Sequence, residues 1–165
     1  MKNILITGAN SFIGTSVEAW LLRNKNEYKV DTVDTMNDAW KKADFTKYDV
    51  VFHVAGIAHV DPKPEMAPLY YKVNRDLTVE IAKHAKASGV KQFVFMSSQI
   101  VYHASKSLEG TVISKNTKPN PNDFYGDSKL QAEKGLNELN TEDFKVVNLR
   151  PCMIYGTNGK GCLLY

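Results

Sequence analysis

Short apolar runs recur along this 165-residue chain, and polar or amphipathic segments separate them. The runs predict β-strands at residues 3–7, 29–33, 50–55, 92–97 and 144–149. Helical patterns fall between most of these strands. Strands that alternate with helices pair in parallel and are covered on both faces, so the pattern predicts an α/β fold with a doubly wound parallel sheet.

Three helices are predicted from apolar positions that recur every three or four residues. The first carries Val17 and Leu21 on one face. The second should run from about 67 to 88, because Gly89 is placed to end it, and the third from about 125 to 139. These helices would cover the two faces of the sheet.

Two connections depart from a regular alternation of strands and helices. Residues 34–49 are too few for a full strand and helix, so the third strand of the sheet should be very short or missing. Residues 105–122 contain several Lys, Asn and Pro residues and predict an exposed loop.

Composition and charge limit the possible partners. The net charge of +3 comes from scattered Lys and Arg residues, which argues against nucleic acid. No apolar stretch approaches the roughly 20 residues that span a bilayer, and residues 1–6 enter a strand without signal-peptide features, so we expect a cytoplasmic protein without a membrane partner. Cys152, Cys162 and the histidines lack metal-ligand spacing, so no metal site is expected, and His53 is expected to pack at a strand end.

A turn between Gly8 and Gly14 follows the first predicted strand. Without side chains, the glycines let the backbone approach a pyrophosphate, whose charge is met by the amino end of the next helix. Asp34, twenty residues after Gly14, would accept hydrogen bonds from a ribose diol and repel a 2′-phosphate, which favours NAD over NADP. The alternative is a plain tight turn with a solvated Asp34.

Tyr125 and Lys129 lie four residues apart at the start of the third predicted helix. Their side chains project from one face, so the ammonium can stabilise a phenolate and make the tyrosine a base. Such a base at neutral pH needs its pKa lowered by about three units from ~10, or ~4 kcal/mol. A bound oxidised nicotinamide, which is positive, would supply much of this shift. The alternative is a surface Tyr and Lys without a catalytic role.

Six stretches of the chain resemble extended short-chain dehydrogenases/reductases of the NAD-dependent epimerase/dehydratase family, the group that includes UDP-glucose 4-epimerase. They are residues 7–14, 49–56, 73–74, 93–102, 125–129 and 149–156, and they occur in the family's order along the whole chain. The resemblance implies a Rossmann fold with NAD bound across the carboxyl ends of the strands.

The resemblance also implies roles for individual residues. Tyr125 would be the acid/base, Lys129 its electrostatic partner and a ribose ligand, and Ser98 the hydroxyl that orients the substrate, with Ser97 as the alternative. The implied cofactor-binding residues are Gly8, Asn10, Ser11, Phe12, Ile13, Gly14, Asp34, Asp44, Phe45, Val54, Ala55, Gly56, Asn74, Ser97, Tyr125, Lys129 and Pro151. Asp44 and Phe45 resemble the family's pair at the adenine. Ser11 stands where the family usually has glycine, so a weaker or displaced pyrophosphate contact is expected.

The activity implied by the resemblance is hydride transfer between NAD and a sugar carbon of a nucleotide-activated hexose. Family members are about twice as long as this chain, so residues 1–165 are expected to be the cofactor domain of a longer enzyme whose substrate domain is absent here. The alternative is a short, non-catalytic dinucleotide-binding or interaction module. The helices predicted at 67–88 and 125–139 resemble the pair through which family members form homodimers.

Overall fold

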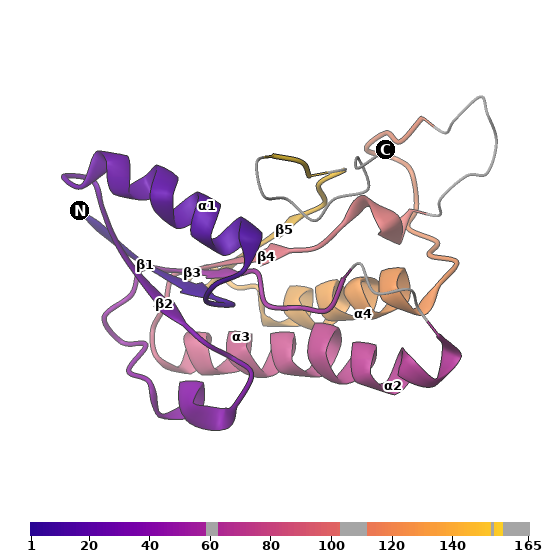
Figure 1. Cartoon of the computed structure of the whole chain (residues 1–165), viewed down its shortest axis with the longest axis horizontal. Helices are drawn as coiled ribbons and strands as arrows, with labels where there is room; N and C mark the ends of the chain where they lie inside the picture. The colour runs from indigo at the N-terminus through magenta and orange to yellow at the C-terminus, as the bar shows by residue number, and fades with distance from the viewer. Residues whose placement is uncertain (59–62, 103–111, 153, 157–165) are drawn as a thin grey trace.

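The computed structural model describes residues 1–58, 63–102, 112–152 and 154–156. Their strands form one parallel sheet in the order β2-β1-β3-β4-β5. The strands are β1 (Lys2–Thr7), β2 (Tyr28–Val33), β3 (Val50–His53), β4 (Gln92–Met96) and β5 (Lys145–Leu149). Figure 1 shows α1 (Phe12–Leu21) on one face and α3 (Thr78–Ala87) with α4 (Phe124–Leu139) on the other. The doubly wound α/β fold predicted from the sequence is confirmed.

The two faces of the sheet bury separate apolar clusters, because successive strand residues point to opposite sides. On the α1 side, Ile6 and Phe52 pack with Leu21. On the α3 and α4 side, the core is larger and consists mainly of aromatic and aliphatic residues from the strands and both helices. Its buried members are Leu5, Trp40, Phe45, Tyr48, Val51, Ile81, Ala82, Ala85, Val90, Phe93, Phe95, Ala132, Leu136 and Phe144.

A short 3-10 helix, η2 (Asp38–Lys42), connects β2 and β3 in place of a further strand. Its Trp40 is only 1% exposed. The ring packs edge-on against His84 of α3 at 5.8 Å between ring centroids. One large aromatic residue thus covers the core beside β2. The prediction of a very short or missing third strand is confirmed.

The helix predicted over 67–88 consists of three consecutive segments. They are α2 (Ala67–Tyr70), the π-helix η4 (Tyr71–Leu77) and α3. The apolar spacing predicted the length of the helix but not the π-helix, in which each N–H bonds to the carbonyl five residues earlier. The buried residue of η4 is the polar Asn74.

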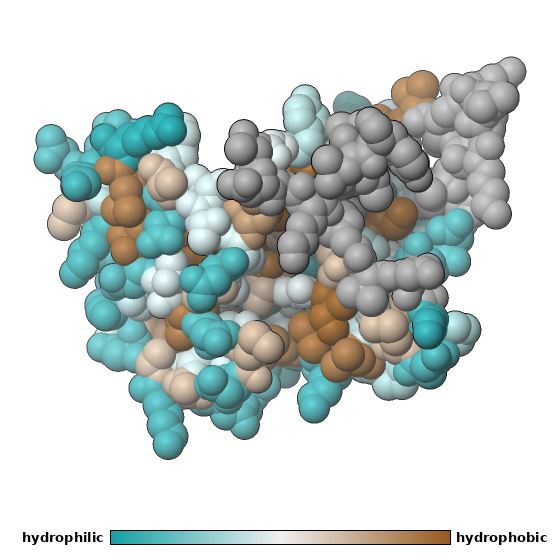
Figure 2. Space-filling view, viewed as in Figure 1, coloured by the Kyte–Doolittle hydropathy of each residue, from teal (hydrophilic) through white to brown (hydrophobic). Residues whose placement is uncertain are grey.

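The remaining elements are short. They are the 3-10 helices η1 (Leu22–Asn24), η3 (Pro64–Met66) and η5 (Gln99–Val101). The expected loop at 105–122 has neither helix nor strand over its described part, 112–122, whereas 105–111 lie outside the described residues. Within the ranges described, no helix is both long and apolar enough to cross a bilayer. The visible described surface in Figure 2 is mostly hydrophilic, with apolar residues in small separate areas.

Candidate active site

The predicted glycine turn lies at the carboxyl end of β1, where the chain turns sharply into α1. Gly8 has a φ of +95°, and Asn10 has a φ of 64°. A Cβ atom at position 8 would lie 2.8 Å from the backbone nitrogen of Ala55. Only glycine therefore fits this position, because both the backbone angle and the close approach to the segment after β3 exclude a side chain.

Ser11 caps the amino end of α1. Its Oγ accepts a hydrogen bond from the backbone N–H of Gly14 at 3.1 Å. A Cβ atom on Gly14 would lie 2.7 Å from that Oγ, so the serine and the second glycine are packed tightly together. The serine hydroxyl thus takes one of the first N–H groups of the helix. The weaker or displaced pyrophosphate contact expected from Ser11 stays a prediction.

The two carboxylates expected near the adenosine both bind their own loops. Asp34, exposed just after β2, accepts a hydrogen bond through Oδ1 from the N–H of Met36 at 2.9 Å. The Oδ1 of Asp44 accepts from the backbone N–H and the hydroxyl of Thr46 at 2.9 and 2.6 Å, and these bonds, the hydroxyl first, lower the pKa of Asp44. The Phe45 side chain is buried in the core, so its only group near an adenine would be its backbone.

The segment Val54-Ala55-Gly56 follows β3 and is held by Asn74 of η4. The Asn74 side chain accepts from the N–H of Ile57 at 2.8 Å and donates to its carbonyl at 3.1 Å. A Cβ atom on Gly56 would lie 2.9 Å from Asn74 Oδ1 and 3.1 Å from Lys129 Nζ. The absence of a side chain at position 56 therefore lets the amide and the ammonium lie directly beside this segment.

Tyr125 lies in the first turn of α4. Asp123 caps this helix by accepting a hydrogen bond from the N–H of Gly126 at 2.6 Å. Burial raises the pKa of Tyr125, while its hydrogen bond with the Ser98 side chain acts in the opposite direction. The net effect is a raised pKa of Tyr125, whereas a base at neutral pH needs a lowered pKa. The sequence motif attributes that lowering to Lys129 and a bound nicotinamide.

The structure distinguishes Ser98 from its neighbour Ser97. Ser98 interacts with Tyr125, and its Oγ also accepts from the N–H of Ile100 at 3.3 Å. Ser97 points away from the phenol, because its Oγ donates to the buried Glu133 at 2.5 Å. Of the two candidates named from the sequence, only Ser98 is therefore next to Tyr125.

Lys129, one turn after Tyr125, is buried with its Nζ donating to the carbonyl of Met96 at 3.0 Å. The ammonium lies 4.8 Å from the centroid of the Phe95 ring. Burial lowers the pKa of Lys129 to about 8, and Glu133 partly opposes this change. A lysine with this pKa loses its charge close to physiological pH. Such shifted pKa values are common among the residues of functional sites.

Sequence reasoning missed a buried hydrogen-bond network centred on His53. The Nδ1 and Nε2 atoms of His53 lie 2.5 Å from Thr7 Oγ1 and 2.9 Å from Thr78 Oγ1. Thr78 donates its hydroxyl proton to the carbonyl of Asn74, so it accepts from Nε2–H, and Nδ1 accepts from Thr7. Burial lowers the pKa of His53 to about 3, with a contribution from Lys129. This hydrogen-bond network joins the end of β1 to η4.

The predicted residues gather along the carboxyl edge of the sheet. Gly8, Asp34, Val54 and Ser98 follow four neighbouring strands, and Pro151 follows β5, where its carbonyl accepts from the N–H of Gln99 at 3.0 Å. Tyr125 and Lys129 reach the same edge from α4. Open α/β sheets bind ligands at this edge.

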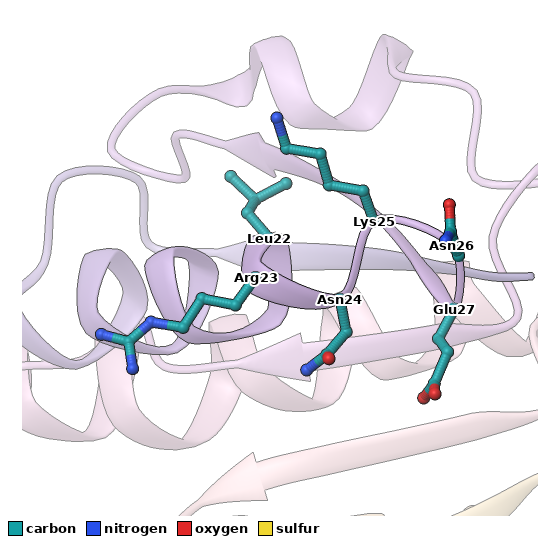
Figure 3. Close-up of a pocket in the computed structure, with 6 residues that line it drawn as sticks. All are labelled: Leu22, Arg23, Asn24, Lys25, Asn26 and Glu27. Atoms are coloured by element: carbon teal, nitrogen blue, oxygen red, sulfur yellow. The ribbon is translucent and has the colours of Figure 1, made fainter.

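A surface hollow of about 330 Å³ lies elsewhere. Its lining residues are Leu22, Arg23, Asn24, Lys25, Asn26 and Glu27, which precede β2 and therefore lie at the opposite, amino edge of the sheet. Figure 3 shows their long side chains extending in different directions rather than toward a common centre. The hollow is not part of the candidate site.

The parallel sheet, the glycine turn and the residues on α4 define a dinucleotide-binding domain of the Rossmann type. The chain belongs to the NAD dependent epimerase/dehydratase family, whose family model matches residues 4–162. The family recognised from the sequence motifs and its NAD cofactor are therefore confirmed.

Individual relatives agree with this assignment. The chain is 34% identical to UDP-glucose 4-epimerase of Vibrio cholerae over 177 residues, which cover 96% of this chain and 54% of that protein. It resembles dTDP-4-dehydrorhamnose reductase of Bacillus anthracis in complex with NADP, with 25% identity, a TM-score of 0.77, and coverage of 98% and 57%. UDP-glucuronic acid 4-epimerase of Bacillus cereus in complex with NAD has the same fold, with 24% identity, a TM-score of 0.75, and coverage of 93% and 57%. The chain spans about half the length of these relatives.

Proposed function

We propose that this chain is the cofactor domain of an enzyme that interconverts nucleotide sugars by hydride transfer to and from NAD. The observation that carries the proposal is the contact between Ser98 and Tyr125 at the carboxyl edge of the sheet, with Lys129 buried one helical turn away. A hydroxyl, a phenol and an ammonium in this order suit removal of a proton from a sugar hydroxyl.

The residues present fit NAD. Gly8 lets the turn after β1 pack directly against Ala55, and the N–H groups of Phe12 and Ile13 at the amino end of α1 would bind the pyrophosphate. Asp34 would accept hydrogen bonds from the adenosine ribose, and Lys129 would donate to the nicotinamide ribose beside Gly56. When bound, NAD supplies the hydride acceptor or donor for the sugar carbon.

In this proposal Tyr125 takes the proton of the sugar hydroxyl, while Ser98 donates a hydrogen bond to the same oxygen. The pKa of Tyr125 is raised by burial, so a positive charge close to the phenol is needed to ionise it. The ammonium of Lys129 and the oxidised nicotinamide both carry that charge. The proton then returns from Tyr125 when the hydride is given back.

The substrate class follows from the relatives rather than from a residue of this domain. UDP-glucose 4-epimerase of Vibrio cholerae supports a UDP-hexose, and this chain covers 54% of that protein. We therefore propose a UDP-hexose 4-epimerase whose remaining residues hold the sugar nucleotide against the nicotinamide. Positioning of that kind can contribute about 7 to 11 kcal/mol to a barrier, so residues 1–165 alone should give no more than trace turnover.

The decisive experiment compares Tyr125→Phe with Tyr28→Phe, a control at the opposite end of the sheet. The protein that contains this domain together with its substrate domain is mixed with NAD⁺ and UDP-glucose, and the formation of bound NADH and UDP-galactose is followed. Tyr125→Phe should abolish both while NAD⁺ still binds, and Tyr28→Phe should leave both intact. Undiminished turnover by Tyr125→Phe would refute the proposed base, and NAD⁺ binding without any turnover in the wild type would favour a non-catalytic module.

A homodimer is proposed through the helices that lie side by side on one face of the sheet (Figure 1). The Tyr71 hydroxyl of η4 donates to Asp127 of α4 at 2.7 Å, and Arg75 donates to Gln131 at 2.8 Å. These contacts hold the two helices as one surface that a second copy would cover as a four-helix bundle. Light scattering that gives a strict monomer at high concentration would rule this out.

A further inference from the structure

Glu133 is a charged side chain almost completely removed from water. It is 1% exposed and lies on α4 one turn after Lys129. Burying a carboxylate is costly unless hydrogen bonds and an opposite charge compensate it. Glu133 has both kinds of partner, and they come from two different strands of the sheet.

The first partner is Ser97 at the exit of β4. Its hydroxyl donates to Glu133 Oε1 at 2.5 Å, and its N–H donates to the carbonyl of Leu149 in β5 at 2.8 Å. Ser97 is therefore bound on one side by α4 and on the other by the neighbouring strand. Ser98 is the next residue along the chain.

The second partner is Arg150, directly after β5. Its guanidinium donates to both Glu133 oxygens, from Nε at 3.0 and 3.2 Å and from Nη2 at 2.5 Å. It also donates to the hydroxyl of Tyr102, just beyond η5. A bidentate contact of this kind has one orientation, so it holds the exits of β4 and β5 at the same point of α4.

Three successive turns of α4 thus meet three successive residues of the β4 exit. Lys129 binds the carbonyl of Met96, Glu133 binds Ser97, and Tyr125 interacts with Ser98. A slide of α4 along β4 would break all three contacts together, because they share one rigid helix. Of the three helix residues, only Glu133 is also bound to the exit of β5, through Arg150.

We propose that Glu133 is a positioning residue, whose carboxylate fixes the register of α4 against the end of β4 and so holds Tyr125 opposite Ser98 and Lys129 beside Gly56. The inference rests on the proposed function, since it gives Glu133 a role in the same site. Glu133 touches neither substrate nor cofactor and acts through the residues it aligns.

The test uses Glu133→Gln, Ser97→Ala and the matched control Glu138→Gln, an exposed glutamate on the same helix. Each protein is labelled with ¹³C-tyrosine, and the ionisation of Tyr125 is followed by NMR without cofactor, with Tyr125→Phe used for assignment. Glu133→Gln and Ser97→Ala should raise the pKa of Tyr125, because its contact with Ser98 lengthens. NAD⁺ binding, measured by calorimetry, should weaken about tenfold or more in Glu133→Gln because Lys129 is displaced. Glu138→Gln should change neither.

A merely structural role predicts a different result. If Glu133→Gln and Ser97→Ala lower only the unfolding midpoint, with the pKa of Tyr125 and NAD⁺ affinity as in the wild type, the proposal is wrong. If Glu133→Gln does not fold, Ser97→Ala decides, because its Glu133–Arg150 pair is retained. Wild-type protein that fails to bind NAD⁺ would refute the proposed function, while the measurement on Tyr125 would still test the role of Glu133.

Discussion

The ammonium of Lys129 donates a hydrogen bond to the carbonyl of Met96 at 3.0 Å, although the residue is only 5% exposed. No carboxylate bonds directly to this ammonium among the described residues, and burial lowers the pKa of Lys129 to about 8. A buried cation of this kind reduces stability, so its position reflects the needs of the site rather than of the fold.

Lys129→Met should therefore stabilise the folded chain at pH 7 and weaken NAD⁺ binding. The folded pKa of about 8 lies below the ordinary lysine value of 10.5, so between these values the unfolded state binds more protons and wild-type stability rises with pH. The stability difference, wild type minus Lys129→Met, should rise by up to about 1.4 kcal/mol per pH unit in this window. Urea unfolding at several pH values measures it, and a flat difference would contradict the burial of a charged lysine.

His53 should make the fold sensitive to acid. Its pKa is about 3 in the folded chain, against 6.5 for an ordinary histidine in the unfolded chain. As the pH falls below 6.5, the unfolded state therefore binds a proton that the folded state does not bind. Stability from this residue is therefore present above pH 6.5 and is lost progressively toward pH 3. The stability difference between wild type and His53→Gln, measured by urea unfolding, should shrink as the pH falls across this window. A constant difference would show that His53 has the same pKa in the folded and unfolded chain, which would contradict its burial.

Gly8 and Gly89 form a matched pair for testing the glycine turn. Both have positive φ, +95° and +82°, but a Cβ atom would meet the backbone of Ala55 only at Gly8, whereas Gly89 has open space. Gly89→Ala should cost about 1–2 kcal/mol from the backbone angle alone. Gly8→Ala should cost more and weaken NAD⁺ binding, because Ala55 must move. Equal effects of the two substitutions on unfolding and on calorimetric NAD⁺ affinity would contradict the close approach.

Asp34 should decide between NAD and NADP. Its carboxylate is exposed beyond β2 and would repel a 2′-phosphate, so the chain should bind NAD⁺ more tightly than NADP⁺. Asp34→Ala should lose most of this preference, because both the ribose acceptor and the repulsion are removed. Calorimetric titration with both cofactors tests it, with Asp38→Ala as the control. Tighter binding of NADP⁺ by the wild type would refute this role for Asp34.

Much of the fold follows from local patterns in the sequence. The apolar runs predict each described strand to within two residues of its ends, and the short connection before residue 50 predicts the missing third strand. Four candidate site residues are also predicted from the sequence alone, because glycine turns and pairs four residues apart on a helix are local features. They are Gly8, Asp34, Tyr125 and Lys129. Periodicity and spacing contain this information because they depend only on the nearby backbone.

Tertiary packing alone decided the rest of the candidate site. Ser97 and Ser98 are equivalent in the sequence, but successive residues of an extended segment point to opposite sides, and the position of α4 determines which one meets Tyr125. The burial of Glu133 depends on Ser97 and Arg150, residues 36 and 17 positions away. The π-helix around Asn74 and the buried Trp40 depend in the same way on distant partners. Such contacts are set by how the layers pack, which no local pattern encodes.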